Sequence, residues 1–358
     1  MQQIVFLTVS DKFTKGFIQF FKNHFNFEQF LFIVIGNNKY KFQTNDSNII
    51  FVNNNYKLFS LKILKKIIKC KKIIISPVGG SVVLFTSFPF LLSKTYLMFW
   101  GSDFYSMRNK EKFLKKPIAV LSSLYKKYVI KRAHGIINLI EEDYDALCEI
   151  VVPRGERFVA QVRGDERLNE YILSLYSNNS CNEYTIIQIG NSATPENHHV
   201  EAMEMIKGFS EENIKVICPL SYGEEEYCRH VISKGYEYFG DKFEPITSFM
   251  GEKEYYEKIS KNNIAIFNND RQQAMGNITT LLGVGCKVFL RSDTSMWQHY
   301  SNNYHFAVYD TAEIENMSFD EFIMFSDDNK KKNLTEYQKK RDIAVAIAEW
   351  RDVLDMEV

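Results

Sequence analysis

The stretch IAIFNNDRQQAMGNITTLLGVGCKVFLRSD, residues 264–293, predicts the fold most directly. Its first four residues form an apolar run typical of a buried strand, residues 274–285 have a helical pattern, and residues 286–293 contain a second apolar strand. A strand, a helix and another strand in this order are typical of parallel sheets with helical crossovers. The stretch therefore predicts an α/β fold.

The same alternation extends along the rest of the chain. In the second half, strands are predicted within residues 184–192 and 214–223, and helices within 195–209 and 224–235. In the first half, the pattern predicts helices in 17–25 and 56–70, and strands in 2–10, 30–36, 71–77, 94–103 and 132–143. Residues 151–182 lack clear periodicity, and the polar segment 174–184 predicts a linker.

Two successive α/β series predict two Rossmann-like domains with a ligand cleft between them. The expected bounds are residues 1–170 and 183–333, followed by a tail of one or two helices in 334–358. Ligands of open parallel sheets bind beyond the carboxyl ends of the strands. The residues directly after the predicted strands are therefore the functional candidates.

The charge of the chain is strongly uneven. The 358 residues carry no net charge, yet residues 1–135 contain 22 basic and 5 acidic residues, a net charge of +17, so the remainder carries −17. Lysines are dense in residues 62–72 and 110–132, where aromatic residues lie among them, so an anionic lipid surface is the expected partner. A merely solvated lysine face is the alternative. Nucleic acid is not expected, because no known binding motif is present and the second half is acidic.

The six cysteines show no C-x-x-C pair and no histidine at zinc-like spacing, which favours free thiols in a reducing cytoplasm. The apolar run 4–9 is too short for a signal peptide. The uncharged stretch 73–93 is long enough to span a bilayer, but Pro77, Gly79, Gly80 and Pro89 interrupt it. A strand, a loop and a buried helix are the favoured interpretation there.

A phosphate site is predicted after the strand that ends near Asn268. Arg271, Gln272 and Gln273 lie in or beside the turn, and Gly276 lies at the start of the next helix. A helix N-terminus presents unpaired N–H groups and a partial positive charge, and an arginine adds a bidentate contact to phosphate. The alternative is an ordinary surface arginine beside a glycine needed for helix packing.

Small residues also follow the strand within 184–192. Gly190, Asn191 and Ser192 permit a ligand to approach the backbone and supply hydrogen bonds. The segment is not G-x-G-x-x-G, so a dinucleotide site is not supported. His198 and His199 are expected in the first turns of the next helix, where a solvated or capping role competes with catalysis.

Carboxylates follow strands in the basic half. Asp103, in FWGSDFYS (residues 99–106), and Asp11, after the first strand, are candidate general bases, and a helix N-cap is the alternative for each. Asp143 and Asp145 have D-x-D spacing, which can hold a divalent metal and a diphosphate. An acidic helix N-terminus is the simpler interpretation, so no metal or other cofactor is expected.

Several of these segments resemble a known family. Residues 189–203, 218–223, 264–293 and 296–300 (IGNSATPENHHVEAM, CPLSYG, the opening stretch and MWQHY) resemble the TDP-N-acetylfucosamine:lipid II N-acetylfucosaminyltransferases, glycosyltransferase family 56, of the 4-alpha-L-fucosyltransferase type. FWGSDFY and VSD, residues 99–105 and 9–11, resemble its N-terminal motifs. The similarity is dense only in residues 186–300, and the first domain diverges strongly.

The resemblance implies a hexosyltransferase of the GT-B fold that uses a dTDP-sugar and no metal. It also implies an undecaprenyl-diphosphate-linked acceptor and a peripheral place on the cytoplasmic face of the bacterial inner membrane. The sequence NND before Arg271, and Asn277 after Gly276, depart from the family pattern. UDP- or GDP-sugars, and an O-antigen or capsule enzyme that transfers fucose or another deoxy-amino sugar, therefore stay open, as does a non-catalytic binding protein of the same fold.

The resemblance places Asp103 on the acceptor side of the cleft. On the hypothesis of glycosyl transfer, Arg271 is expected to offset the charge of the leaving diphosphate, and Asp103 or Asp11 to deprotonate the acceptor hydroxyl if the reaction inverts configuration. Trp297 and Asp293 are possible pocket-lining residues, although a core position is equally compatible with Trp297. The expected donor site contains Gly190, Asn191, Ser192, Tyr222, Gly223, Arg271, Gln272, Gln273, Gly276 and Asn277.

Overall fold

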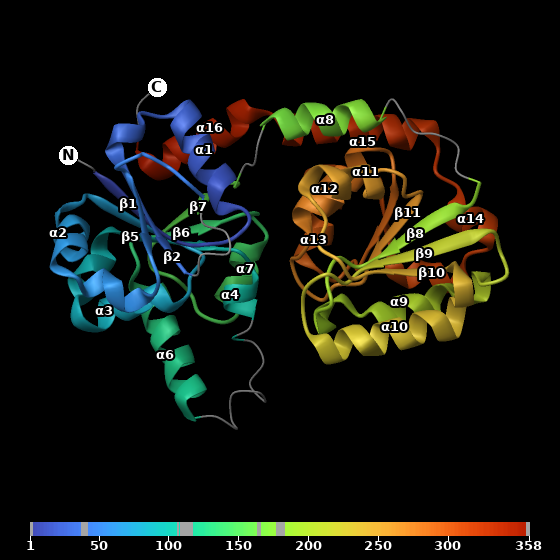
Figure 1. Cartoon of the computed structure of the whole chain (residues 1–358), viewed down its shortest axis with the longest axis horizontal. Coiled ribbons are helices and arrows are strands. Elements are labelled where there is room, and N and C mark those ends of the chain that lie inside the picture. The colour runs from blue at the N-terminus through green and yellow to red at the C-terminus, as the bar shows by residue number, and fades with distance from the viewer. Residues whose placement is uncertain are drawn as a thin grey trace. The chain divides into compact units, whose positions relative to one another are not determined.

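The computed structural model describes residues 3–36, 42–105, 107, 117–162, 166–176 and 183–355. It divides the chain into a first unit, Met1–Glu166 with Ile343–Val358, and a second unit, Arg167–Asp342. Each unit contains one parallel sheet with helices on both faces (Figure 1). The predicted pair of α/β domains is therefore confirmed.

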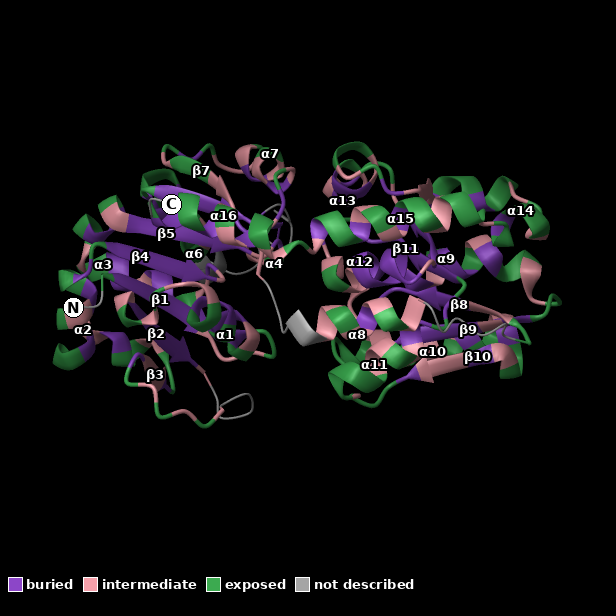
Figure 2. Ribbon diagram, turned by 90° about the horizontal axis from the view of Figure 1, so that it is seen from above, coloured by how far each residue is buried: buried purple, intermediate pink, exposed green. Residues whose placement is uncertain are grey.

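The first unit contains a seven-stranded sheet. Its strands lie in the order β3-β2-β1-β4-β5-β6-β7. In the centre, Leu7 pairs with Ile33 on one side and Ile75 on the other. The central strands are buried on both faces (Figure 2), which explains their continuous apolar sequences. The strands are β1 (Ile4–Val9), β2 (Phe30–Ile35), β3 (Ile49–Val52), β4 (Lys72–Ser76), β5 (Thr95–Phe99), β6 (Gly135–Asn138) and β7 (Glu156–Val159).

Helices cover both faces of this sheet. One face packs against α1 (Thr14–His24) and α16 (Ile343–Leu354). The other face packs against α2 (Leu61–Lys69), α3 (Leu84–Ser87), α4 (Ser102–Tyr105), α6 (Pro117–Arg132) and α7 (Asp143–Cys148). In α2, Ile63 and Ile67 are buried one turn apart while the lysines face outward, so the amphipathic pattern explains the packing.

The second unit contains a six-stranded sheet in the order β10-β9-β8-β11-β12-β13. Its strands are β8 (Thr185–Ile189), β9 (Ile214–Pro219), β10 (Phe243–Ile246), β11 (Ile264–Phe267), β12 (Lys287–Leu290) and β13 (Val308–Asp310). One face carries α9 (His199–Ile206), α10 (Glu225–Phe239) and α14 (Phe319–Ile323). The other face carries α8 (Glu166–Tyr176), α11 (Glu252–Ile259), α12 (Met275–Gly283), α13 (Ser295–Trp297) and α15 (Asp327–Lys340). The strand, helix and strand predicted within residues 264–293 are confirmed as β11, α12 and β12.

The C-terminal tail is shared between the two units. The one or two helices expected there are present as α15 and α16, but α15 belongs to the second unit and α16 to the first. Trp350 of α16 is fully buried, and its ring lies 4.9 Å from that of Phe21 and 5.5 Å from that of Phe17. This aromatic cluster explains why α16 packs against the first sheet rather than forming a separate segment.

Two segments, residues 151–184 and 73–93, can be compared with what their sequences predicted. Residues 151–182, which lack clear periodicity, contain β7 and α8, and Ile172 of α8 is buried in the core of the second unit. The first three residues of the expected linker, 174–176, belong to α8, and residues 177–182 lie outside the described residues. The uncharged stretch 73–93 forms β4, α3 and the 3₁₀ turns Gly80–Val83 and Pro89–Lys94, as favoured. Within the described ranges, every helix is too short or too polar to cross a bilayer.

Candidate functional site

The second sheet reverses its strand order between β8 and β11. The chain passes from β8 to β9 on one side, and β11 lies on the other side of β8. Ligands of doubly wound sheets bind at such a switch point, beyond the carboxyl ends of the strands. Two loops follow these strands. The loop after β8, residues 190–198, contains Gly190, and the loop after β11, residues 268–274, contains Arg271; both were predicted from the sequence to bind the donor.

Hydrogen bonds join these two loops. The Gln273 side-chain amide donates to Thr194 Oγ1 at 3.4 Å, and the Asp270 N–H donates to the Glu196 carbonyl at 3.3 Å. His198 Nε2 also lies 3.4 Å from a carboxylate oxygen of Asp270. Segments about 80 residues apart in sequence therefore form one surface, since Gln273 and Thr194 differ by 79 positions.

Arg271 is held within this surface. Its side chain is 14% exposed and its Nη2 lies 4.0 Å from Glu196. Its Nη1 donates to the carbonyl of Gln272 at 3.1 Å. A guanidinium has five N–H donors, so most of them stay available to an anionic ligand.

The N-terminus of α12 lies beside Arg271. Ala274 precedes the helix with a φ of 54°, and none of the described side chains caps the first N–H groups. Gly276 is exposed, and outside its own helical turn no atom of the described residues lies within 4 Å of the position that a Cβ would occupy there. The helix start therefore combines unpaired backbone donors, a partial positive charge and open space, which suits a diphosphate.

The loop after β8 is built around Gly190. This residue has a φ of +65°, and a Cβ on it would lie 2.5 Å from His199 Nε2. The next residue, Asn191, donates from its side chain to the Tyr222 hydroxyl at 3.1 Å, and its backbone N–H donates to Asn197 Oδ1 at 3.0 Å. Among the described residues, the buried Asn191 Oδ1 has no hydrogen-bond partner, so it can accept a bond from a ligand. Ser192 is buried next to Thr194 and supports the loop.

A third loop, after β9, is joined to the same surface by backbone hydrogen bonds. The Glu224 N–H donates to the Ala193 carbonyl at 2.7 Å, and Ala193 pairs with Gly223 in an isolated parallel bridge. Gly223 has a φ of +130°, a conformation that favours glycine. Tyr222 is exposed beside Asn191. The structure thus brings together the three motifs expected to form the donor site.

The two histidines of this region have different surroundings. His198 precedes α9 in a left-handed conformation, whereas the ring of His199 is buried. Burial, and secondarily the charge of His198, lowers the pKa of His199 to about 3, so its imidazole is neutral near pH 7. His199 Nδ1 lies 3.3 Å from the Tyr227 hydroxyl. His199 therefore supports the backbone at Gly190 from beneath.

The remaining predicted donor-site residues lie around α12. Gln272 is buried, and the Asn277 side chain donates to the Tyr255 hydroxyl at 3.1 Å. Trp297 is half-buried and packs against the core beneath α12, a core position that the sequence left open. Asp293 is exposed and forms an ion pair with Arg291 at 2.8 Å. Asp293 therefore belongs to a surface ion pair, and its role in lining a pocket stays a prediction.

Asp103 links two loops at the carboxyl edge of the first sheet. Its carboxylate accepts the N–H of Val78 at 3.0 Å and that of Trp100 at 3.1 Å. Burial raises the pKa of Asp103 to about 6, although these hydrogen bonds oppose the rise. The carboxyl group therefore changes its charge close to neutral pH, in the range useful to a general base.

Asp11 has the surroundings of a helix-start residue. Its Oδ1 accepts the backbone N–H groups of Phe13 and Thr14, each at 2.9 Å, and the Thr14 hydroxyl at 2.8 Å. These bonds stabilise the turn that leads into α1, although the N-cap position itself is occupied by Phe13 rather than by Asp11. Asp143 and Asp145 lie in the first turn of α7, as the simpler interpretation expected. Asp143 is buried and accepts a hydrogen bond from the Tyr105 hydroxyl at 3.1 Å, whereas Asp145 is exposed.

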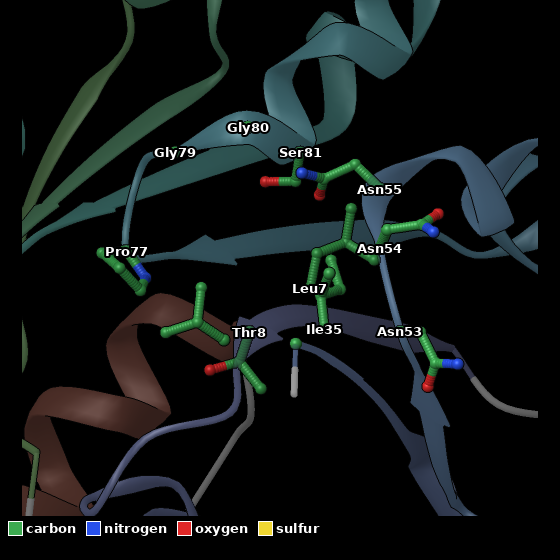
Figure 3. Close-up of a pocket in the computed structure, with 12 residues that line it drawn as sticks. Leu7, Thr8, Ile35, Asn53, Asn54, Asn55, Pro77, Gly79, Gly80 and Ser81 are labelled. Atoms are coloured by element: carbon green, nitrogen blue, oxygen red, sulfur yellow. The ribbon is translucent and has the colours of Figure 1, made fainter. Parts of the chain in front are cut away.

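One pocket was not predicted from the sequence. It lies within the first unit, has a volume of about 300 Å³, and is formed by the carboxyl ends of β1 and β2 and the loops after β3 and β4 (Figure 3). Asn53, Asn54 and Asn55 line one side of it. They were missed because β3, which precedes them, has only one fully buried residue and no continuous apolar signal. Among the described residues, no group of three His, Cys, Asp or Glu side chains is placed to hold a metal ion.

Comparison with solved structures identifies the fold. Sucrose-phosphate synthase from Thermosynechococcus elongatus superimposes with a TM-score of 0.70 at 10% identity, over 100% of both chains. HepE from Anabaena, in complex with UDP and glucose, gives 0.69 at 12% identity, also over 100% of both chains. A trehalose 6-phosphate synthase from Burkholderia multivorans gives 0.67 at 7% identity, over 99% of both chains. These similarities show that the two units form the GT-B fold of glycosyltransferases.

The sequence itself matches a glycosyltransferase family over residues 92–322. The matched segment covers both the Asp103 loop and the three loops of the second unit that follow β8, β9 and β11. It spans more than half of the 358 residues, and the expected resemblance is confirmed. The protein therefore belongs to the 4-alpha-L-fucosyltransferase family, glycosyl transferase group 56, and is a hexosyltransferase.

Proposed function

We propose that this enzyme transfers fucose or a deoxy-amino sugar from a nucleoside diphosphate, preferably dTDP, to a lipid-linked oligosaccharide of a bacterial surface polysaccharide. The observation that carries this proposal is the pairing of Arg271 with the uncapped N-terminus of α12 at the switch point of the second sheet. Such a pairing suits the diphosphate of a sugar nucleotide. The complex of Anabaena HepE with UDP supports a nucleotide-sugar donor on this fold.

The proposed reaction has two parts, the departure of the diphosphate and the removal of a proton from the acceptor hydroxyl. The bond between the sugar C1 and the β-phosphate oxygen breaks, and its electron pair leaves with the diphosphate. Arg271 and the α12 amides offset the charge that develops there, which is usually the largest electrostatic contribution to such catalysis. In an inverting reaction, the acceptor hydroxyl oxygen attacks C1 and its proton passes to Asp103. We assign this role to Asp103 rather than Asp11, because Asp11 Oδ1 already accepts three hydrogen bonds in the turn before α1, whereas burial raises the pKa of Asp103 to about 6.

The activity should depend on pH through Asp103. Its pKa of about 6 means that the carboxylate form, which a base requires, is lost as the pH falls below that value. We expect kcat/KM to decline on the acid side with an apparent pKa near 6, and Asp103→Asn to lower turnover and abolish that decline. Asp11→Asn is the matched control and should retain it. An unchanged acid limb in Asp103→Asn would remove Asp103 from the proton transfer.

A donor screen tests the function directly. A ligand that binds only the folded state raises the melting temperature, so dTDP-sugars are expected to stabilise the protein more than UDP- or GDP-sugars. Transfer of a labelled sugar then distinguishes an enzyme from a non-catalytic binding protein of the same fold. We further propose that no metal takes part, so transfer should persist in EDTA. Loss of transfer that Mg²⁺ or Mn²⁺ restores would contradict metal independence.

The acceptor that we propose is linked to undecaprenyl diphosphate, and the enzyme would bind peripherally to the cytoplasmic face of the inner membrane. Residues 1–135 carry a net charge of +17. On α6, Leu121, Leu124 and Tyr128 recur at helical spacing and are 67%, 58% and 40% exposed, with Lys131 one turn further. Apolar and basic side chains on one helix face favour binding to anionic lipid.

Vesicle sedimentation tests this surface. Wild-type protein should bind vesicles of anionic lipid more strongly than vesicles of zwitterionic lipid, and salt should weaken the binding. The double variant Leu121→Glu, Leu124→Glu should lose most of it, whereas Met324→Glu, at an equally exposed apolar residue of the second unit, should not. Equal sedimentation of wild type and the α6 double variant would argue against this docking surface.

A further inference from the structure

The first turn of α12 is held from its buried side by Tyr300. The Tyr300 hydroxyl donates to the Met275 carbonyl at 2.7 Å, and the Thr279 hydroxyl lies 2.8 Å from the same phenolic oxygen. Because a phenol has one hydrogen and Met275 receives it, Thr279 is the donor in the second bond. Tyr300 is fully buried, and Thr279 is 3% exposed. One buried side chain therefore bonds to two residues that lie one turn apart at the start of the helix.

The start of α12 needs such support because it lacks a cap. Among the described residues, no side chain caps its first N–H groups, and Ala274 before it has a left-handed backbone. A cap normally stabilises the first turn of a helix by bonding to these groups. At α12 they are left to a ligand, so the geometry of the turn depends on contacts made from the core. The turn is exposed at Gly276 and held from beneath by Tyr300.

Tyr300 belongs to an unusual segment of the backbone. Residues Gln298–Asn303 form a π-helix that follows α13, and such segments occur frequently at functional sites. The Tyr300 carbonyl accepts the N–H of Phe306 at 2.8 Å, and the rings of these two residues lie 5.7 Å apart, edge to face. Both rings are part of the core of the second unit, so the tyrosine is fixed in place.

The neighbouring residue of the π-helix is attached to α15. His299 is buried, and its Nε2 lies 2.6 Å from Lys340 Nζ, which also lies 4.0 Å from the centre of the Tyr304 ring. Lys340 is 7% exposed, and a buried ammonium group requires partners of this kind. The last residues of α12 also pack on α15, because the Tyr337 ring leaves no room for a Cβ on Gly283. The π-helix and α12 are therefore both anchored on the same helix.

We propose that Tyr300 is a positioning residue of the transfer reaction, whose hydroxyl group holds the first turn of α12 in the geometry that binds the diphosphate of the donor. The segment MWQHY, residues 296–300, then contributes to the reaction through this contact. Burial raises the pKa of Tyr300, so the hydroxyl group keeps its proton and stays a donor near neutral pH. The inference rests on the proposed donor site at α12, and it adds a residue that does not itself contact the donor.

Tyr300→Phe tests the inference, because it removes the hydroxyl group and keeps the ring. The probes are dTDP, UDP and GDP with their nucleosides, and the Kd of each is measured by calorimetry or, for the nucleosides, by NMR. The nucleoside diphosphate that wild-type protein binds most tightly should bind to the variant about tenfold more weakly, a change of roughly 1.4 kcal/mol. The Kd of the matching nucleoside should stay within about twofold, or about 0.4 kcal/mol, because a nucleoside carries no diphosphate.

Thr279→Val is the second variant, and it removes the other hydroxyl group of the pair with little change in shape. It should weaken the same nucleoside diphosphate, and the double variant should bind that probe about as tightly as Tyr300→Phe alone. Two residues that act through one contact are not expected to have additive effects. In transfer assays, Tyr300→Phe should lower kcat/KM for the nucleotide-sugar and leave the KM for the acceptor unchanged at saturating donor.

Tyr309→Phe is the matched control. The Tyr309 hydroxyl accepts a hydrogen bond from the Asn329 amide at 3.1 Å in the same unit, and it makes no bond to α12 among the described residues. Its replacement should leave the Kd of every probe unchanged. The melting temperature of each variant is measured alongside, and Thr279→Val carries the test if Tyr300→Phe is too unstable to titrate.

A merely structural role for Tyr300 would lower the melting temperature and leave the Kd of the nucleoside diphosphate at its wild-type value. That result would overturn the inference, as would equal weakening of the nucleoside and the nucleoside diphosphate. A wild-type protein that binds none of the three nucleoside diphosphates would instead contradict the proposed donor itself. The two failures are distinguishable, because the second is seen without any substitution.

Discussion

Replacement of Arg271 by alanine is expected to lower turnover by about 10²-fold or more, equivalent to roughly 2.7 kcal/mol of transition-state stabilisation. The guanidinium is largely buried between two loops and keeps most of its donors free for the diphosphate, whose negative charge grows as the sugar leaves. The measurement is kcat at saturating donor and acceptor. The fold should be retained, because within the described part of the chain the side chain makes one hydrogen bond, to a neighbouring carbonyl, and a 4.0 Å ion pair.

Two further variants sharpen this prediction. Arg271→Lys retains the charge but loses the planar fork, so its turnover should lie between that of wild type and that of the alanine variant. Arg229→Ala removes an exposed arginine that pairs with Glu225 on α10, and it should leave turnover unchanged. If Arg271→Ala turned over at nearly the wild-type rate, the diphosphate would have to be held elsewhere.

The second large effect is expected for Gly190→Ala. Alanine in the left-handed region costs roughly 1–2 kcal/mol, and overpacking adds about 1–3 kcal/mol. The new methyl group would lie 2.5 Å from His199 Nε2 and 2.8 Å from Asn197 Oδ1, and both of those side chains are fully buried. Urea denaturation should therefore show a loss of several kcal/mol in the free energy of unfolding. Donor affinity should fall with it, because the loop carries Asn191.

Gly276→Ala and Gly208→Ala are the control substitutions for Gly190→Ala, because each adds the same methyl group at another glycine. Neither position has an atom within 4 Å of the added Cβ, so both variants should retain wild-type stability. Only Gly276→Ala should weaken donor binding, because its methyl group enters the open space at the start of α12. Full donor affinity in Gly276→Ala would argue against a diphosphate at this helix terminus, and a fully stable Gly190→Ala would argue against a rigid loop.

The sequence predicted interior strands and missed edge strands. Nine strands of the two sheets were expected from continuous apolar runs, and all nine are flanked by strands on both sides. The four that were not expected, β3, β7, β10 and β13, are the four edges of the two sheets. Edge strands are partly exposed, as in β7, where no residue is fully buried, so they lack the apolar run that identifies a strand covered by helices.

The candidate site was predictable in part for a related reason. Polar residues that directly follow apolar strands must lie at the carboxyl edge of a parallel sheet, so Arg271 and Asn191 could be proposed from the sequence. The bonds that give them their surroundings join distant residues, such as Gln273 with Thr194. The pocket formed by Asn53 to Asn55 depended on β3, an edge strand, and therefore had no signal in the sequence.

The sequence by itself determined the succession of the interior strands along the chain, some of the helices between them, the polarised charge and the place of Arg271 just before α12. Each of these depends on residues that are neighbours along the chain, whose hydrophobic period and helix-start chemistry are local properties. Only the tertiary structure decided that α16 returns to the first unit, that Asp103 is held by Val78, and that Asn53, Asn54 and Asn55 line a pocket together with Ser81. Those arrangements depend on packing between segments that are far apart in sequence. The burial of a carboxyl group, and therefore its pKa, is determined by the elements that pack around it.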